Sequence, residues 1–329
     1  MKKSLFISNM TSKVYDPQVA GMIGGLVDVY EPPMSRETVA QDPSILADLQ
    51  VLFTSWNPPV LDEAFLAAAP KLEAVFCAAG SIREFVTEAF WESGAVVCSA
   101  WAANAIPVAE FSLAQILLGL KQTHRAATLY RQQIVHSEIT PHILGNYKSK
   151  VGIISLGMIG RLVAEYLKRF DVQVLAYDPC VSEAEARDAG VILTDLDEIF
   201  RSCQVISLHT PWLKETEGLI RGRHLSLMPP GGTFINTARG AIVDEDELAH
   251  IFKERSDLSA VMDVTIKEPL PKDSPLWSLP NVILTPHIAG SVGRECYRLG
   301  RYMLEELQHY LADEPLKWAI TRDKAAVMA

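Results

Sequence analysis

The sequence predicts an α/β protein made of two doubly wound domains, each a parallel sheet with helices on both faces. Short apolar runs alternate with helix-length segments across the first hundred residues, and the same alternation restarts at Val151 with stronger strands. Between these two blocks lies one long apolar helical segment, and after Gly290 the chain returns to a helical pattern. Short buried runs separated by crossover helices are typical of parallel sheets.

Composition limits the class of protein. The chain has 329 residues, 49% hydrophobic and 21% charged, so two domains with large cores are expected. Its net charge of −10 argues against a broad nucleic-acid surface, which needs clustered Lys and Arg. No apolar run approaches the roughly 18 residues of a membrane span, so we expect a cytoplasmic protein with neither membrane nor nucleic-acid partners. The five cysteines include no Cys-x-x-Cys pair, which predicts buried free thiols and no metal site.

The first block predicts a small domain with five parallel strands. These strands are expected at residues 5–8, 27–30, 51–54, 74–77 and 96–98. A helix over residues 104–121 follows, in which Pro107 is tolerated because it falls in the first turn. Apolar residues occupy most sides of this helix, so we expect it to be buried between domains or subunits, and we predict a homodimer.

The second block predicts a sheet that binds a dinucleotide. Six strands are expected at residues 151–155, 172–177, 205–208, 233–236, 260–263 and 282–284. Strands with intervening helices in this number are typical of a doubly wound dinucleotide-binding sheet. The helical pattern of residues 293–311 is expected to return to the first domain. Residues 1–102 and 291–329 then form one domain, and residues 103–290 are inserted in it.

A glycine-rich turn, Ser-Leu-Gly-Met-Ile-Gly at residues 155–160, follows the first strand of the second block. A strand that runs into a helix N-terminus presents backbone N–H groups to a phosphate. Gly157 and Gly160 match the close-approach and helix-packing positions of the dinucleotide fingerprint, but Ser155 replaces its first glycine. A serine there costs on the order of 1 kcal/mol if its backbone is held in a sparsely populated conformation.

Asp178 follows the second strand of this block, 21 residues after Gly157. At that position a carboxylate accepts hydrogen bonds from the adenosine ribose hydroxyls. The alternative interpretation is an acid that caps a helix before Pro179. Because an acid repels a 2′-phosphate and no Arg or Lys falls within eight residues after Asp178, NAD is favoured over NADP.

Three chemically able residues, Arg239, Glu268 and His287, come after successive strands of the second block. A guanidinium can hold a carboxylate in a bidentate fork, and a histidine poised by an acid can move a proton. Taken singly, each residue also fits a surface or structural role. All three are expected at one edge of a cofactor-binding sheet. Together they predict one catalytic site, in which Arg239 binds an anion, Glu268 is the acid and His287 is the base.

These motifs resemble those of the D-isomer-specific 2-hydroxyacid dehydrogenases, and the likeness covers nearly the whole chain. It is carried by residues 104–110, 151–160, 209–211, 236–240, 285–290, and Asp263 with 268–270. The resemblance implies a Rossmann dinucleotide-binding domain inserted in a flavodoxin-like substrate domain. It also implies NAD as cofactor, a homodimer, and hydride transfer between NAD(H) and a small 2-oxo acid or D-2-hydroxy acid.

The resemblance further implies roles for individual residues. Arg239 binds the substrate carboxylate and carbonyl, and His287 is the acid/base that Glu268 tunes. The backbone at Ala79 and Gly80 is an anion site for the substrate, although residues 78–83 (Ala-Ala-Gly-Ser-Ile-Arg) depart from the usual Gly-x-Gly-x-Asp form. The expected cofactor-binding residues are Ser155, Gly157, Met158, Ile159, Gly160, Asp178, His209, Thr210, Pro211, Thr216, Thr237, Ala238, Asp263 (to the nicotinamide amide), His287 and Gly290.

The substrate and the class of function each keep an alternative. Glyoxylate, hydroxypyruvate, a bulkier 2-oxo acid and 3-phosphohydroxypyruvate are all candidates, the last less favoured because no basic cluster is evident near Gly80. The second hypothesis is an NADH-sensing binding protein, similar to the C-terminal-binding-protein corepressors, which keep the same three residues. Turnover distinguishes the two. No separate peptide-docking extension is visible, which favours the enzyme.

Overall fold

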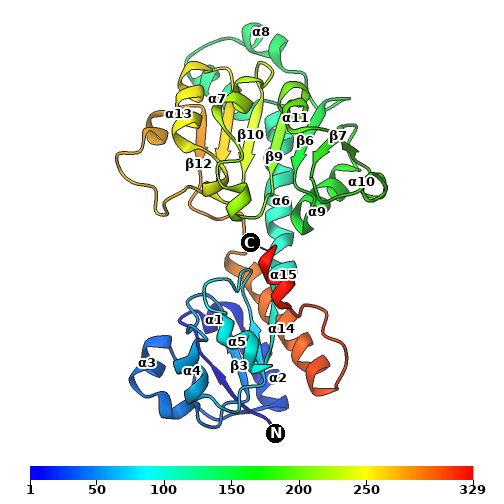
Figure 1. Ribbon diagram of the computed structural model, residues 1–329. Helices are drawn as coiled ribbons and strands as arrows, with labels where there is room; N and C mark the ends of the chain where they lie inside the picture. Colours follow the sequence, from blue (N-terminus) through cyan, green and yellow to red (C-terminus); the bar gives the residue numbers. More distant parts are fainter. Residues whose placement is uncertain (329) are drawn as a thin grey trace. The chain divides into compact units, whose positions relative to one another are not determined.

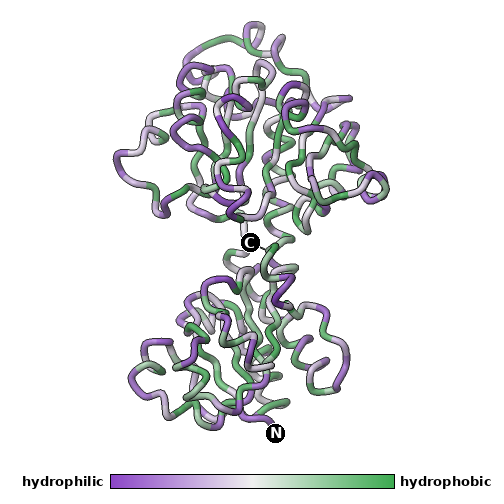
Figure 2. The backbone as a smooth tube through the Cα atoms, viewed as in Figure 1, coloured by the Kyte–Doolittle hydropathy of each residue, from purple (hydrophilic) through white to green (hydrophobic). Residues whose placement is uncertain are grey.

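The computed structural model describes residues 1–328 and divides into two compact units. One unit comprises residues 1–105 and 291–328, and the other is Ile106–Gly290, so the second is inserted in the sequence of the first. The boundary after residue 105 lies three residues beyond the expected one. Figure 1 labels many of the elements of both units, and Figure 2 shows hydrophobic residues concentrated along the strands of each.

The first unit contains a sheet of five parallel strands in the order β2-β1-β3-β4-β5. This is the strand order of flavodoxin-like folds. The strands are β1 (Lys3–Phe6), β2 (Asp28–Val29), β3 (Val51–Thr54), β4 (Ala74–Cys77) and β5 (Val96–Ser99). The five predicted strands are confirmed, with ends that differ by at most two residues.

Helices flank this sheet, and the C-terminal part of the chain returns to it as predicted. The helical elements are α1 (Thr11–Val14), α2 (Pro17–Leu26), α3 (Arg36–Gln41), η1 (Pro43–Leu46), α4 (Glu63–Ala68), α5 (Glu88–Ser93), η6 (Gly293–Glu295), α14 (Cys296–Leu311) and α15 (Arg322–Ala326). Helix α14 packs on α1, α2 and β4. It approaches α1 closely because Gly300 has no side chain: a Cβ there would lie 2.2 Å from the carbonyl oxygen of Val14.

The second unit contains a sheet of seven parallel strands in the order β12-β11-β10-β9-β6-β7-β8. The strands are β6 (Lys150–Ile154), β7 (Gln173–Tyr177), β8 (Ile192–Leu193), β9 (Val205–Leu208), β10 (Thr233–Asn236), β11 (Ser259–Met262) and β12 (Val282–Leu284). The six predicted strands are confirmed. The sequence does not predict β8, because two residues, one of them exposed, are too few to show a strand pattern. The strand order reverses between β6 and β9, and doubly wound sheets bind ligands at such a switch point.

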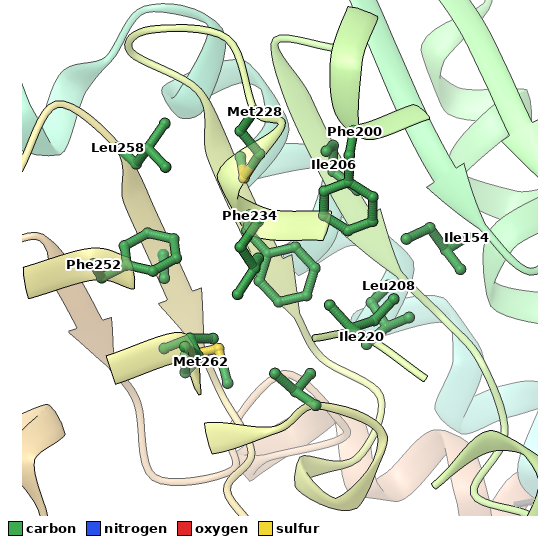
Figure 3. Close-up of a cluster of buried hydrophobic side chains, with 14 of the residues drawn as sticks. Ile154, Phe200, Ile206, Leu208, Ile220, Met228, Phe234, Phe252, Leu258 and Met262 are labelled. Carbon is green, nitrogen blue, oxygen red and sulfur yellow. The ribbon is translucent and has the colours of Figure 1, made fainter. Parts of the chain in front are cut away.

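Helices cover both faces of the second sheet. The elements are α6 (Trp101–Leu120), which begins in the first unit, α7 (Thr123–Arg131), α8 (His136–Ile139), η2 (Thr140–His142), α9 (Met158–Leu167), α10 (Glu183–Ala189), α11 (Leu196–Ser202), η3 (Lys214–Thr216), α12 (Gly222–Ser226), η4 (Gly240–Ile242), α13 (Glu245–Glu254) and η5 (Pro275–Ser278). Figure 3 shows part of the core on one face of this sheet, where Phe200, Phe234 and Phe252 are fully buried.

The structure bears on two expectations from composition, and it corrects the second. Among the described residues, α6 has the length and mean hydropathy of a membrane span, whereas the sequence predicts no such segment. A core helix passes the same test, and half of this window is buried, with Ile116 and Leu120 in the core of the second unit. Four of the five free cysteines are buried as predicted, but Cys180 is exposed because it lies in the loop after β7.

Candidate active site

The expected cofactor and catalytic residues lie at the carboxyl ends of neighbouring strands of the second sheet. Asp178 follows β7, Ser155 follows β6, His209 follows β9, Arg239 follows β10, Asp263 follows β11, and the loop from His287 to Gly290 follows β12. Because these six strands are parallel and adjacent, the residues share one edge of the sheet. The edge includes the switch point between β6 and β9.

Ser155 adopts the backbone conformation of the fingerprint glycine that it replaces. Its φ is +74°, in the left-handed region that non-glycine residues seldom occupy. The Ser155 hydroxyl lies 2.8 Å from Thr210 Oγ1, which joins the turn after β6 to the loop after β9. Gly160 packs against the backbone of Ser155. A Cβ at Gly160 would lie 2.1 Å from the carbonyl oxygen of Ser155, so only glycine fits there.

The N-terminus of α9 fits the pyrophosphate of a dinucleotide. Its N-cap residue is Gly157, and a Cβ at that position would have no atom of the described residues within 4 Å. Met158 and Ile159 begin the helix. The first N–H groups of a helix have no partner within it, and the helix dipole favours an anion there.

Asp178 links the glycine turn to the loop after β7. Its Oδ2 accepts a hydrogen bond from the Leu156 N–H at 2.7 Å, and its Oδ1 accepts one from the Cys180 N–H at 2.8 Å. Each carboxylate oxygen can accept more than one hydrogen bond. Asp178 therefore anchors the turn and can still accept hydrogen bonds from ribose hydroxyls.

The loop after β9 contains a buried neutral histidine. Burial lowers the pKa of His209 to about 3. His209 Nε2 lies 3.0 Å from Ser207 Oγ, whereas Nδ1 is buried and has no hydrogen-bond partner among the described residues. An unpaired buried nitrogen at the switch point fits a site that a ligand completes. Thr216 closes this loop, since its hydroxyl donates to the Pro211 carbonyl at 2.6 Å and accepts from the Leu213 N–H.

His287 and Glu268 form a hydrogen-bonded pair. His287 Nδ1 lies 2.6 Å from Glu268 Oε2, and the two side chains are 50% and 39% exposed. The other carboxylate oxygen of Glu268 accepts from the Thr265 N–H at 3.2 Å. His287 has a φ of +53°, so its backbone also lies in the left-handed region.

Asp263 holds the loop that carries His287. This carboxylate is 2% exposed and accepts three hydrogen bonds, from the Thr285 hydroxyl at 2.6 Å, the Ile288 N–H at 2.9 Å and the Ala289 N–H at 2.8 Å. Its carbonyl oxygen accepts from the His287 N–H at 2.9 Å. The sequence does not reveal this role, because the partners are 22 to 26 residues away in the chain.

Arg239 lies in a loop that a buried asparagine shapes. Asn236 Oδ1 accepts from the Ala238 N–H, and its Nδ2 donates to the Arg239 carbonyl, both at 3.0 Å. The Arg239 guanidinium donates to the Ala238 carbonyl at 2.7 Å. Thr237 Oγ1 lies 3.1 Å from the hydroxyl of Ser112 on α6, so the loop is also tied to that helix.

The Arg239 loop packs directly against the Glu268 loop. A Cβ at Gly240 would lie 2.0 Å from the carbonyl carbon of Thr265 and 2.2 Å from the nitrogen of Ile266. Glu245, at the start of α13, accepts a hydrogen bond from the Ile266 N–H, and burial raises the pKa of this carboxyl. In the sequence, Glu245 resembles any acid in a first helical turn. The structure thus joins the Arg239 and Glu268 loops through backbone contacts that residue patterns do not show.

In the first unit, a buried serine orients the loop after β4, where the sequence predicts a backbone anion site. The buried Ser99 hydroxyl lies 2.7 Å from the carbonyl oxygen of Ala79 and 2.8 Å from that of Gly80. The C=O and N–H of a trans peptide point in opposite directions. The N–H groups of Gly80 and Ser81 therefore point away from Ser99 and remain suited to an anion. The sequence does not identify Ser99 as the residue that orients this loop.

Comparison with known proteins relates the chain to one family. Residues 113–289 match the model described as D-isomer specific 2-hydroxyacid dehydrogenase, NAD binding domain. D-3-phosphoglycerate dehydrogenase of Mycobacterium bovis is 35% identical over 77% of this chain and 48% of that protein. (S)-sulfolactate dehydrogenase of Chromohalobacter salexigens is 33% identical over 71% of this chain and 76% of that protein.

The fold agrees with solved structures. D-lactate dehydrogenase of Aquifex aeolicus, complexed with NAD and lactic acid, is 26% identical, with a TM-score of 0.71 over 94% of this chain and 96% of that one. The chain spans about half the length of the phosphoglycerate dehydrogenases that it matches.

Proposed function

Because the chain belongs to the D-isomer specific 2-hydroxyacid dehydrogenases, with an NAD-binding domain at residues 113–289, we propose that it interconverts a small 2-oxo acid and a D-2-hydroxy acid. The 2.6 Å contact between His287 Nδ1 and Glu268 Oε2 carries this proposal. An imidazole that donates Nδ1–H to a carboxylate keeps Nε2 for proton exchange with a substrate oxygen. The pair stands at the sheet edge where the cofactor fingerprint also lies.

The residues act together in reduction of the 2-oxo acid. Bound NADH supplies the hydride to the carbonyl carbon. His287 gives its Nε2 proton to the carbonyl oxygen as the hydride arrives, and Glu268 stabilises the imidazolium before that transfer. Arg239 binds the substrate carboxylate and carbonyl, which keeps the carbonyl aligned with the hydride and with His287.

The cofactor is held by backbone groups and one acid. The N–H groups at Gly157 and Met158 receive the pyrophosphate, and Asp178 accepts the ribose hydroxyls. The family shows NAD binding; the preference for NADH over NADPH rests on the negative charge of Asp178. Steady-state kinetics with both cofactors tests it, and a kcat/KM with NADPH equal to that with NADH contradicts it.

Activity is tested with a panel of 2-oxo acids, each followed by loss of NADH absorbance. We expect turnover with at least one member of the panel, and the backbone N–H groups of Gly80 and Ser81 to hold the substrate anion. An NADH-sensing protein binds NADH without turnover of any member. The named relatives are dehydrogenases of phosphoglycerate and of sulfolactate, so phosphorylated and sulfonated 2-oxo acids belong in the panel.

His287→Ala tests the proton donor. We expect kcat to fall by roughly 10² to 10⁴ with nearly unchanged NADH affinity. The matched control is His250→Ala, because His250 also pairs with a carboxylate, Glu254 at 3.5 Å, but on the exposed side of α13. Equal rates for wild type and His287→Ala contradict the mechanism.

Glu268→Gln tests the pair. Without the anion the imidazolium is less stable, so ketone reduction should lose activity at a lower pH than in wild type. The measurement is kcat/KM against pH for both proteins. Two superimposable profiles contradict the role of Glu268.

We also propose a homodimer that uses exposed apolar side chains of the segment after α6. Tyr130, Val135, Leu144 and Tyr147 are between 52% and 71% exposed, although such side chains are usually buried. Light scattering should return twice the chain mass of 36.3 kDa. A monomer mass at micromolar concentration contradicts the proposal. The cytoplasmic location expected from the sequence stays a prediction.

A further inference from the structure

The first unit contains a pocket of about 290 Å³ beside the Gly80 loop. Its walls come from that loop, from α5 and from the C-terminal segment around α15. Residues that line it include Ser81, Arg83, Glu88, Trp91, Arg322 and Met328. Its size is near the lower end for small-molecule sites, and Gly80 is the one residue of its lining that the sequence predicts to bind substrate.

The C-terminal wall of the pocket is fixed in place. The fully buried Glu306 of α14 accepts hydrogen bonds from the N–H groups of Lys317 and Trp318. The chain then pairs with the edge strand β5, where the Ile320 N–H donates to the Val97 carbonyl at 2.9 Å. This wall therefore positions Arg322 against a defined surface of the first unit.

The pocket is basic in an acidic protein. Two arginines and one glutamate line it, which leaves one positive charge, whereas the chain carries −10. Arg322 pairs with Glu88 at 2.6 Å, but these side chains are 66% and 57% exposed. Exposed ion pairs are weak, so Arg322 can exchange Glu88 for the anionic group of a ligand. Gly80 and Ser81, whose backbone N–H groups are assigned to the substrate, also line the pocket.

We propose that this pocket receives a second anionic group at the far end of a 2-oxo acid substrate, with Arg83 and Arg322 as specificity-determining residues. The inference rests on the proposed function, because it places the reacting end of the same molecule at the Gly80 loop. Guanidinium groups bind carboxylate, sulfonate and phosphate alike. The apolar walls, which include Trp91 and Met328, suit a short hydrocarbon chain between the two anionic ends.

A matched pair of substrates tests the proposal. 2-Oxoglutarate and 2-oxopentanoate have the same number of carbons, and only the first has a distal carboxylate. We expect kcat/KM to favour 2-oxoglutarate by about tenfold or more in wild type, and Arg83→Gln or Arg322→Gln to remove most of that preference without changing the rate with 2-oxopentanoate. Arg36→Gln is the control, since Arg36 is an exposed arginine of the same unit paired with Glu37.

Two further substrates distinguish the kinds of anion. 3-Sulfopyruvate and 3-phosphohydroxypyruvate show whether a sulfonate or a phosphate is preferred to the carboxylate, and either preference, if lost in both arginine variants, supports the pocket. A ratio that neither variant changes overturns the proposal, as does a wild type that prefers 2-oxopentanoate.

Direct binding separates this inference from the proposed function. Trp91 lines the pocket, so 2-oxoglutarate added without NADH should change the tryptophan fluorescence. The change should be absent in Trp91→Phe and weakened about tenfold or more in Arg322→Gln. Fluorescence binding without turnover of any 2-oxo acid means that the proposed function fails while the anion site stands. If 2-oxopentanoate is turned over but 2-oxoglutarate neither changes the fluorescence nor is preferred as a substrate, the proposed function stands and the anion site fails.

Discussion

The carboxyl edge of the second sheet has two halves that are built differently. We call the loops after β6, β7 and β9, which are proposed to hold the cofactor, the cofactor half, and those after β10, β11 and β12, which contain the proposed catalytic residues, the catalytic half. Each half contains one non-glycine residue with positive φ, Ser155 at +74° and His287 at +53°. Ser155 is supported by a hydroxyl contact with Thr210. The His287 loop is supported by the buried carboxylate of Asp263, which accepts three hydrogen bonds.

This difference shows where each half tolerates change. The cofactor half depends on the absence of a side chain at Gly160, which packs against the Ser155 carbonyl, and the Ser155 hydroxyl contacts Thr210. The catalytic half depends on charged and backbone groups that must all be paired, because buried donors without acceptors are costly. Equivalent substitutions should therefore lower the free energy of unfolding more in the catalytic half than in the cofactor half.

The largest effect is expected from Asp263→Ala. It leaves the Thr285, Ile288 and Ala289 donors without their acceptor, so we expect a loss of roughly 4 kcal/mol in unfolding free energy and a large fall in kcat. Asp178→Ala is the matched change in the cofactor half. Asp178 is itself partly exposed and accepts two hydrogen bonds instead of three, one of them from the exposed Cys180, so water can replace the carboxylate and the loss should be about 1 kcal/mol. Urea denaturation of both variants measures the difference, and equal losses contradict the comparison.

Gly240→Ala should disrupt the catalytic half through packing alone. The added Cβ would lie 2.0 Å from a backbone carbon of Thr265, and the backbone cannot move away without shifting the Glu268 loop. We expect a loss of roughly 3 kcal/mol and a lower kcat. Gly24→Ala in α2 is the control, since its Cβ would have no atom of residues 1–328 within 4 Å. Unchanged kcat in Gly240→Ala would show that the two loops are not coupled.

The two histidines sharpen the comparison through pH. His287 has a carboxylate partner, whereas the pKa of His209 is lowered to about 3 by burial. Below the ordinary value near 6.5, the unfolded chain binds a proton that folded His209 does not. The unfolding free energy therefore falls as pH falls from 6.5 toward 3, by about 1.4 kcal/mol per unit. Between pH 7.5 and pH 5, wild type should lose about 2 kcal/mol more than His209→Gln, measured by urea denaturation. Equal losses mean that His209 protonates normally.

The sequence predicts the fold better than the connections within the site. Strand alternation, the glycine turn and the order of Arg239, Glu268 and His287 along the chain are local patterns, and they give the sheet and its functional edge. Asp263 as the anchor of the His287 loop depends on contacts 22 to 26 residues apart. The role of Glu245 and the close approach at Gly240 depend on packing between loops. No periodicity in the sequence records such contacts.

The smallest effect concerns Ser155, where strain and hydrogen bonding oppose each other. Ser155→Gly relieves the positive φ and loses the hydroxyl contact with Thr210, and both terms are about 1 kcal/mol. The unfolding free energy should therefore change little, and calorimetric titration should still show NADH binding. Ser155→Ala loses the hydroxyl but keeps the strained Cβ, so it should be destabilised by about 1 kcal/mol. The difference between these two variants measures the strain. If alanine were as stable as glycine, the backbone at Ser155 would be unstrained, and only the His287 half would hold a residue against its conformational preference.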